Sequence, residues 1–125
     1  MKAKIVIIFL LALCVCLPLH AKKSKPVPDS VLNAKTIYVI NEAADKGVGD
    51  AAYDELEKWG RYKVVHDRKS ANLIVHFPQG PGSVMYVTTA DSDDRIYQSN
   101  GGIRLTPASQ ARRGIEQFRK WVEEK

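Results

Sequence analysis

The chain has 125 residues, of which 45% are hydrophobic and 26% are charged, and its formal net charge is +5. This length allows one domain, and the composition excludes a disordered, fibrous or multi-pass membrane protein. The apolar residues are unevenly distributed, since Ile5 to Leu17 is an unbroken apolar run of 13 residues.

The first 21 residues have the three regions of a secretory signal peptide. Met1 to Lys4 is a short basic start, the apolar run follows, and Ala21 is a small residue that suits the position before a cut. The 13 apolar residues would form a helix of about 20 Å, shorter than the roughly 30 Å hydrocarbon core of a bilayer. We therefore expect cleavage between Ala21 and Lys22, a periplasmic or secreted protein, and no membrane span after cleavage. The alternative is an uncleaved amino-terminal anchor.

Both cysteines, Cys14 and Cys16, lie in this leader. A lipoprotein would carry a small residue directly before its lipidated cysteine, whereas Leu13 and Val15 occupy those positions. Cleavage after Ala21 leaves a chain without cysteine. Disulfides, thiolate metal sites and cysteine nucleophiles are then excluded together.

Cleavage also lowers the net charge from +5 to +3, because Lys2 and Lys4 are removed. The remaining sequence has no basic helix face and no stripe of alternating basic and aromatic residues, so we expect no binding to nucleic acid. Residues 22–34 contain Pro26 and Pro28 and lack periodicity, which predicts a flexible tether. A single α/β domain is predicted over residues 35–125.

The first half of this domain has the pattern of a β-α-β unit. Residues 36–40 are a β-favouring run, and residues 48–59 carry apolar side chains at helical spacing before Gly60, which suits a helix end. Residues 62–66 and 72–77 predict two further strands. A strand, a helix and a strand joined by short connections predict parallel pairing.

The second half predicts a hairpin and a helix. Residues 84–89 and 95–98 flank an acidic turn, which is typical of two antiparallel strands. Residues 103–105 are expected to be a short strand or an extended stretch. Thr106 and Pro107 suit the cap and first position of a helix that continues to Val122. Gly114 within this helix would permit a close approach to the sheet.

Together these elements predict an α/β (α+β) two-layer sandwich with the order β-α-β-β-β-β-α. We expect a mixed sheet of four to five strands with two helices on one face, and a central position for the first strand. In the third strand Leu73, Val75 and Phe77 alternate with Ile74 and His76, so one face of the sheet should be the more apolar.

The candidates for catalysis are His66, Asp67 and His76. These residues could be imagined as a metal or acid/base site, but two histidines without a third ligand at a known spacing are common by chance. The ordinary interpretation is that each histidine is partly buried or lies on an edge strand of the sheet. We therefore predict no catalytic residue, no metal and no cofactor, and keep a small metal-dependent or acid/base enzyme as the alternative.

The two tryptophans have different expected places. Trp59 ends the apolar stripe of the first helix and should pack on the sheet. Trp121 flanks the stripe of the last helix and is expected to be partly exposed. With Arg119 and Lys120 it forms a candidate partner surface.

Three stretches carry a resemblance to known proteins. Residues 34–40, residues 54–65 with Trp59, Gly60 and the run Tyr62-Lys63-Val64-Val65, and residues 70–75 with Ala71-Asn72-Leu73 resemble small bacterial secreted proteins. Their element order is similar to the amino-terminal domain of TolB and related envelope accessory domains. Asn72 stands where that group usually has aspartate. The resemblance implies a binding or assembly role in the envelope and carries no catalytic residue.

The sequence thus predicts an exported, non-enzymatic binding or assembly module of the bacterial envelope, whose partner would be an envelope protein. The exposed sheet face or an edge strand is the expected contact surface. A purely structural envelope protein is the third hypothesis.

Overall fold

The computed structural model describes residues 25–79, 84–101 and 106–124. The predicted leader with its cleavage site at Ala21 and Lys22, and the stretch expected at 103–105, lie outside these ranges. The elements in chain order are α2 (Asp29–Leu32), β1 (Thr36–Asn41), α3 (Lys46–Trp59), β2 (Lys63–Val64), the short 3-10 helix η1 (Arg68–Ser70), β3 (Leu73–Phe77), β4 (Tyr86–Thr89), β5 (Arg95–Gln98) and α4 (Pro107–Glu123).

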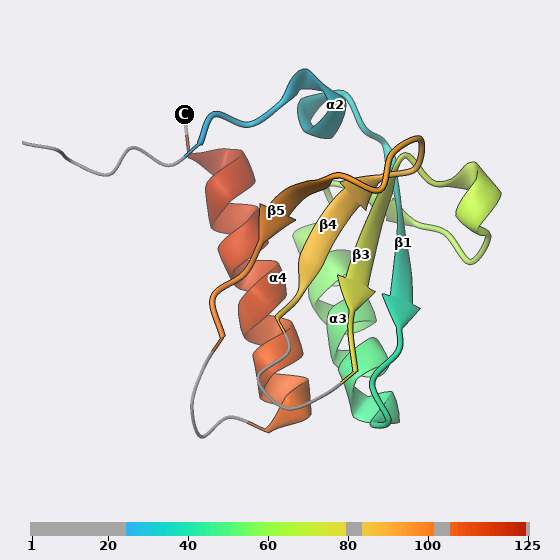
Figure 1. Cartoon of the computed structure of the whole chain (residues 1–125), viewed down its shortest axis with the longest axis vertical. Helices are drawn as coiled ribbons and strands as arrows, with labels where there is room; N and C mark the ends of the chain where they lie inside the picture. The colour runs from blue at the N-terminus through green and yellow to red at the C-terminus, as the bar shows by residue number, and fades with distance from the viewer. Residues whose placement is uncertain (1–24, 80–83, 102–105, 125) are drawn as a thin grey trace, which may run out of the picture.

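The strands form one mixed sheet in the order β2-β1-β3-β4-β5 (Figure 1). β1 is parallel to β2 and β3, while β4 is antiparallel to β3 and β5. The predicted parallel crossover and the predicted hairpin are both confirmed. The expectation of a central first strand is only partly met: β1 has a neighbour on each side, but β3 is the middle strand of the five.

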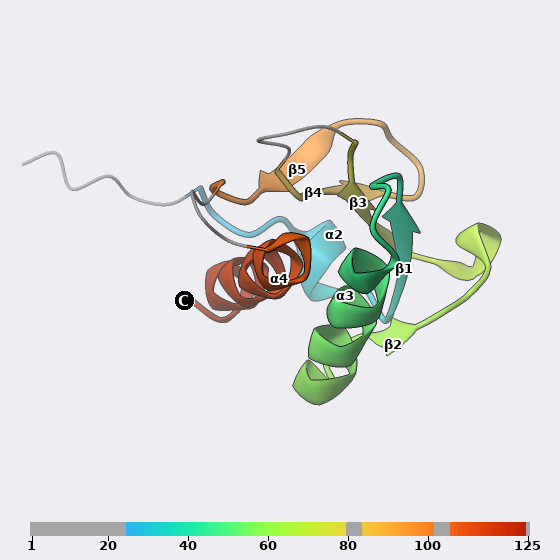
Figure 2. The same cartoon turned by 90° about the horizontal axis from the view of Figure 1, so that it is seen from below.

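Both long helices lie on one face of the sheet (Figure 2), which confirms the two-layer arrangement. α3 begins where the Asp45 carboxylate accepts a hydrogen bond from the Gly47 amide. It ends at Gly60, whose φ of 70° places it in the left-handed region that glycine adopts without strain. α4 begins where the Thr106 hydroxyl oxygen accepts a hydrogen bond from the Ser109 amide, as the sequence predicts.

The core lies between the helices and the sheet, and Phe118 of α4 is at its centre with none of its surface exposed. Its ring lies 5.7 Å from the ring of Trp59, 6.3 Å from that of Tyr62 and 5.3 Å from that of Tyr97. Burial raises the pKa of Tyr97 to about 12. The aromatic cluster therefore joins α3, α4 and the sheet in one packed unit.

The segment predicted to be a flexible tether contains the short helix α2, so that prediction is wrong for its described part, residues 25–34. Val31 is fully buried, and the Tyr62 hydroxyl donates a hydrogen bond to its carbonyl at 3.0 Å. The Trp121 indole donates to the Lys25 carbonyl at 2.9 Å. The prolines prevent regular periodicity, but the segment still docks because Val27 and Val31 pack against the core.

β2 is shorter than the strand predicted over residues 62–66. Tyr62 turns its side chain into the core and is 3% exposed. At the other end Asp67 caps η1, since its carboxylate accepts a hydrogen bond from the Lys69 amide at 3.0 Å. The chain therefore leaves the sheet after two paired residues.

Asn72 anchors the start of β3 to the start of β1. Its Oδ1 accepts hydrogen bonds from the amides of Lys35 at 2.9 Å and Thr36 at 3.2 Å. Both bonds use Asn72 as an acceptor, a role that an aspartate carboxylate fills equally well.

Candidate functional site

The face of the sheet opposite the helices is the candidate site, and we call it the open face. The strand register places its side chains in two rows that cross the sheet from β1 to β5. The rows are Tyr38, Ile74, Thr88 and Arg95, and Ile40, His76, Tyr86 and Gln98. Within the ranges that the structure describes, neither α3 nor α4 covers this face (Figures 1 and 2).

Three side chains from three neighbouring strands form a stack on the open face. The rings of His76 and Tyr86 are nearly parallel, at 7°, with centroids 4.4 Å apart. The Arg95 guanidinium carbon lies 3.9 Å from the centroid of the Tyr86 ring. Because β3 and β5 flank β4 on opposite sides, Tyr86 is held between an imidazole and a cation. Stacking and cation-π attraction both favour this geometry.

Polar contacts fix the two ends of this stack. The His76 Nε2 and the Thr88 hydroxyl oxygen are 2.9 Å apart and share a hydrogen bond whose direction depends on the imidazole tautomer. At the other end, Arg95 Nη1 donates to Gln98 Oε1 at 3.2 Å. Each member of the stack is therefore held by ring contacts or hydrogen bonds to its neighbours on the sheet.

Two residues on the open face are buried although no helix lies over them. Ile74 is 1% exposed and Thr88 is 3% exposed. Ile74 is not part of the core cluster on the helix side. The open face therefore has buried positions of its own, separate from the core on the helix side.

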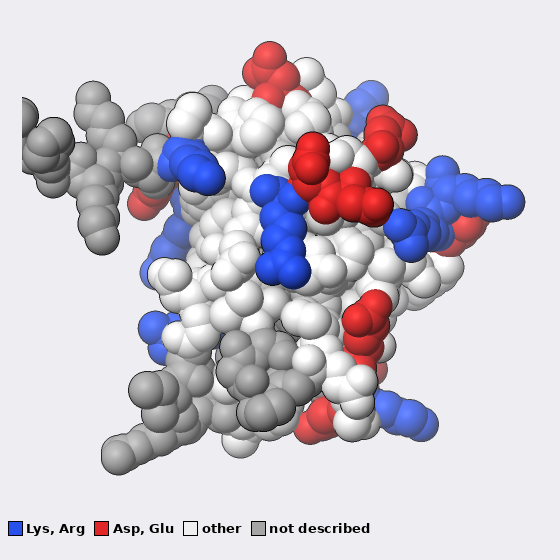
Figure 3. All heavy atoms as spheres, in the orientation of Figure 1, with Lys and Arg blue, Asp and Glu red and all other residues white. Residues whose placement is uncertain are grey.

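The surroundings of His76 on the open face lower the pKa of its imidazole. Burial is the largest cause of its lowered pKa, and the positive charge of Arg68 adds to it. Arg95 acts in the same direction, while Glu42 and Asp93 oppose it. Figure 3 shows this face: uncharged side chains cover much of it, with side chains of both charge signs among and around them.

The three residues considered for catalysis have separate surroundings. The ring of His66 is exposed and lies 5.7 Å from that of Tyr53 of α3, on the helix side. Asp67 caps η1, and His76 belongs to the stack on the open face. In the described part of the chain, no three histidine, cysteine, aspartate or glutamate side chains lie close enough to share a metal ion.

The expectation of a partly exposed Trp121 is wrong. Trp121 is 9% exposed, and its ring stacks on that of Tyr97 at 5.0 Å. The helical spacing placed Trp121 at the border of the apolar stripe, but the docked segment that includes Lys25 extends the core over it. Arg119 and Lys120 are exposed, so the candidate partner surface lacks its aromatic member.

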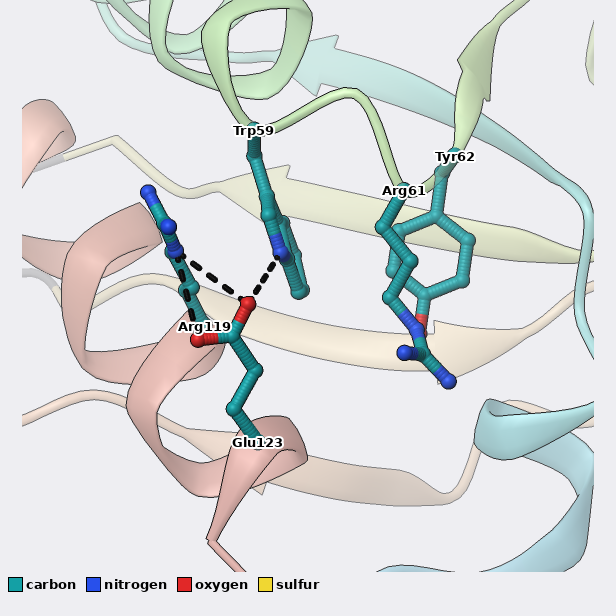
Figure 4. A network of polar contacts seen from close by, with 5 residues as sticks. All are labelled: Trp59, Arg61, Tyr62, Arg119 and Glu123. Atoms are coloured by element: carbon teal, nitrogen blue, oxygen red, sulfur yellow. Dashed lines mark hydrogen bonds and ion pairs between the residues drawn. The ribbon is translucent and has the colours of Figure 1, made fainter.

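Arg119 takes part in a network within the chain (Figure 4). Glu123 Oε1 accepts hydrogen bonds from the Trp59 indole at 2.8 Å and from Arg119 Nε at 3.3 Å. Trp59 is half-buried and lies edge-on to the ring of Tyr62, 5.2 Å away. These contacts tie the carboxyl ends of α3 and α4 together, which gives Arg119 a structural role.

Among the residues of the stack, the sequence prediction considered only His76, as a catalytic candidate or, in its ordinary interpretation, as a partly buried side chain of a strand. The missing signal was the alternation within the last two strands, where Tyr86 and Arg95 occupy outward positions. Alternation assigns residues to a face, but the pairing register decides which of them touch. Tyr86 meets His76 because those two residues are directly paired.

No helix within residues 25–79, 84–101 and 106–124 has the length and apolar character needed to cross a membrane. Comparison with protein-family models, with curated proteins and with solved structures found no match to this chain.

Proposed function

We propose that this chain is an exported binding or assembly module of the bacterial envelope, and that the open face is its contact surface. The proposed export rests on the leader pattern of residues 1–21. The envelope role rests on the resemblance to the amino-terminal domain of TolB. The observation that carries the contact surface is the His76-Tyr86-Arg95 stack on a sheet face that no described helix covers.

The chemistry of this face suits protein contact. The centres of protein interfaces are enriched in aromatic residues and arginine and depleted of other charged residues. Tyr38, Tyr86 and Arg95 supply such side chains, and all three are at least partly accessible. Side chains already restrained by stacking lose less conformational entropy on binding, which favours association.

Site-specific photo-cross-linking in cells tests this proposal. A photoreactive amino acid replaces Gln98, which is exposed in an open-face row, and in a matched control it replaces Arg113, which is exposed on α4. We expect a defined cross-linked product from position 98 and none from position 113, with the captured protein identified by mass spectrometry. Equal labelling from both positions, or no product from position 98, would contradict the open face as the contact surface.

Export is tested separately by sequencing the amino terminus of the protein recovered from the envelope fraction. We expect the mature chain to begin at Lys22. Recovery of the chain only from the cytoplasm would contradict an envelope role, and an intact leader in the membrane fraction would support the anchor alternative.

A further inference from the structure

We infer that Asn100 is a site of spontaneous deamidation, at which the native protein converts to aspartate and isoaspartate forms. This chemistry is independent of the proposed function. The site lies in the connection between β5 and α4, outside both elements. Asn100 and Gly101 are both exposed, and Asn100 is the only one of the four asparagines in the chain that precedes a glycine.

The reaction joins a side-chain amide to the backbone nitrogen that follows it. The Gly101 nitrogen loses its proton to hydroxide and attacks Asn100 Cγ. A cyclic succinimide forms as the Cγ–Nδ2 bond breaks, and Nδ2 takes up a proton from water and leaves as ammonia. Water then opens the ring at either carbonyl carbon. Opening at Cγ gives aspartate, and opening at the backbone carbonyl carbon gives isoaspartate, in which the chain runs through Cγ.

The structure leaves both reacting groups accessible. Asn100 is held through its own backbone N–H, which donates to Gln117 Oε1 at 2.9 Å. Within the described ranges, no hydrogen bond engages the Asn100 side-chain amide or the Gly101 nitrogen. Gly101 also has no Cβ to shield its nitrogen or to restrict the backbone. The Gly101 nitrogen can therefore approach Asn100 Cγ without breaking a contact of either group.

The other three asparagines have different surroundings. Both polar atoms of the Asn41 side chain make hydrogen bonds, at 3.1 and 3.0 Å. Asn72 Oδ1 accepts from two backbone amides at the start of β1, at 2.9 and 3.2 Å. Asn33 is exposed, as Asn100 is, but it precedes Ala34, whose Cβ hinders the attacking nitrogen. Asn33 therefore provides an internal control for Asn100.

The two products should affect the fold differently. Aspartate keeps the backbone N–H that donates to Gln117, and among the described residues the hollow on α4 that Gln117 lines has three basic side chains and one acidic one. Isoaspartate instead inserts a carbon atom into the backbone directly after Ser99, whose amide donates to the Met85 carbonyl at 2.9 Å. We therefore expect the aspartate form to unfold at the same urea concentration as the wild type and the isoaspartate form at a lower one.

Timed incubation of the purified protein at pH 7 and pH 8 tests the inference. Peptide mapping by mass spectrometry, with separation of aspartate from isoaspartate, measures the conversion of each asparagine. We expect both products at Asn100 and the release of an equal amount of ammonia. Conversion should be faster at pH 8 by up to about tenfold, because the attacking nitrogen must lose its proton to hydroxide. Asn33 should remain intact when half of Asn100 has been converted.

Gly101→Ala is the matched variant. Gly101 does not have a positive φ, and a Cβ there would lie 3.4 Å from Val84 Cγ1, an ordinary van der Waals contact. Conversion of Asn100 should slow by about tenfold in this variant, because the Cβ restricts the approach of the nitrogen. If the variant fails to fold by circular dichroism, the comparison with Asn33 in the wild type decides. An Asn100 that stays intact for several weeks at pH 8, equal conversion of Asn33, or an unchanged rate in folded Gly101→Ala would each overturn the inference.

Discussion

The two faces of the sheet are built from alternate residues of the same strands, yet they are stabilised differently. On the helix side, Leu73, Val75 and Val87 are fully buried beneath α3 and α4. On the open face, Ile74 and Thr88 are buried although no described helix covers them (Figure 1). Because successive side chains of a strand point to opposite faces, the same strands form the core on one side and the open face on the other.

This difference separates the packing that stabilises the fold on the helix side from the open face, which we propose as a contact surface. The helix side gains from removing large apolar side chains from water, which contributes about 25 cal/mol for each Å² buried. The open face gains from pairwise contacts such as the stack of His76 on Tyr86, which contribute about 0.5–1.5 kcal/mol each. A surface held by such contacts remains accessible to a partner.

The strongest test of this contrast is Phe118→Ala on the helix side. Phe118 is fully buried among aromatic rings, so its truncation removes a large apolar side chain and leaves a cavity. We expect the free energy of unfolding to fall by about 3–5 kcal/mol in urea denaturation. A loss below about 1 kcal/mol would show that the aromatic cluster is not the main core.

The matching change on the open face is Tyr86→Ala. It removes both the stack with His76 and the cation-π contact with Arg95, and we expect a loss of about 2 kcal/mol, less than at Phe118. Tyr86→Phe keeps the ring and should change stability by less than about 0.5 kcal/mol. Equal losses from Tyr86→Ala and Phe118→Ala would remove the contrast between the faces.

Much of the helix side could be predicted from the sequence because its signals are local. The Thr106 cap, the Gly60 end of α3 and the apolar spacing of α4 each act within a few residues. Trp121 and the docked segment were predicted wrongly because their contact joins residues far apart in the chain. The bond from Trp121 to Lys25 spans 96 positions, and no periodic pattern reports it.

The open face could be predicted only in part for a related reason. Alternation in β3 correctly placed Ile74 and His76 on the less apolar face. Which residues they meet depends on the pairing of β3 with β4 and on the irregular register between β4 and β5 near Val87. Register is set by turns and packing together, so the stack emerges only in the folded sheet.

Gly114→Ala probes how closely α4 approaches the sheet. A Cβ at this position would lie 3.1 Å from Met85 Sδ and 3.2 Å from Met85 Cβ. Alanine favours the helix by about 1 kcal/mol, but overpacking costs about 1–3 kcal/mol and Met85 Cβ is fixed to the backbone. We expect a net loss of about 1 kcal/mol, measured by thermal and urea unfolding.

The control for this substitution is Arg113→Ala, one residue away on the exposed side of α4, which should change stability by less than about 0.5 kcal/mol. A gain in stability from Gly114→Ala would show that helix propensity outweighs the contact with Met85.

The smallest expected effect is a pH dependence that belongs to the open face. Burial, with Arg68 and Arg95, lowers the pKa of His76 below its ordinary value of 6.5, against the opposing fields of Glu42 and Asp93. The unfolded chain therefore binds a proton at His76 more readily than the folded chain does. The contribution of His76 to stability is complete above pH 6.5 and declines as the pH falls from 6.5 through the lowered pKa.

His76→Gln should remove this part of the pH dependence, while Tyr86→Phe, which keeps the stack, should retain it. The measurement is the free energy of unfolding in urea between pH 5 and pH 8 for the three proteins. Identical pH profiles for the wild type and His76→Gln would contradict a lowered pKa of His76 in the folded protein. Raising the salt concentration should reduce the slope only in part, since screening weakens the fields of the four charged residues but leaves the cost of burying a charged imidazole.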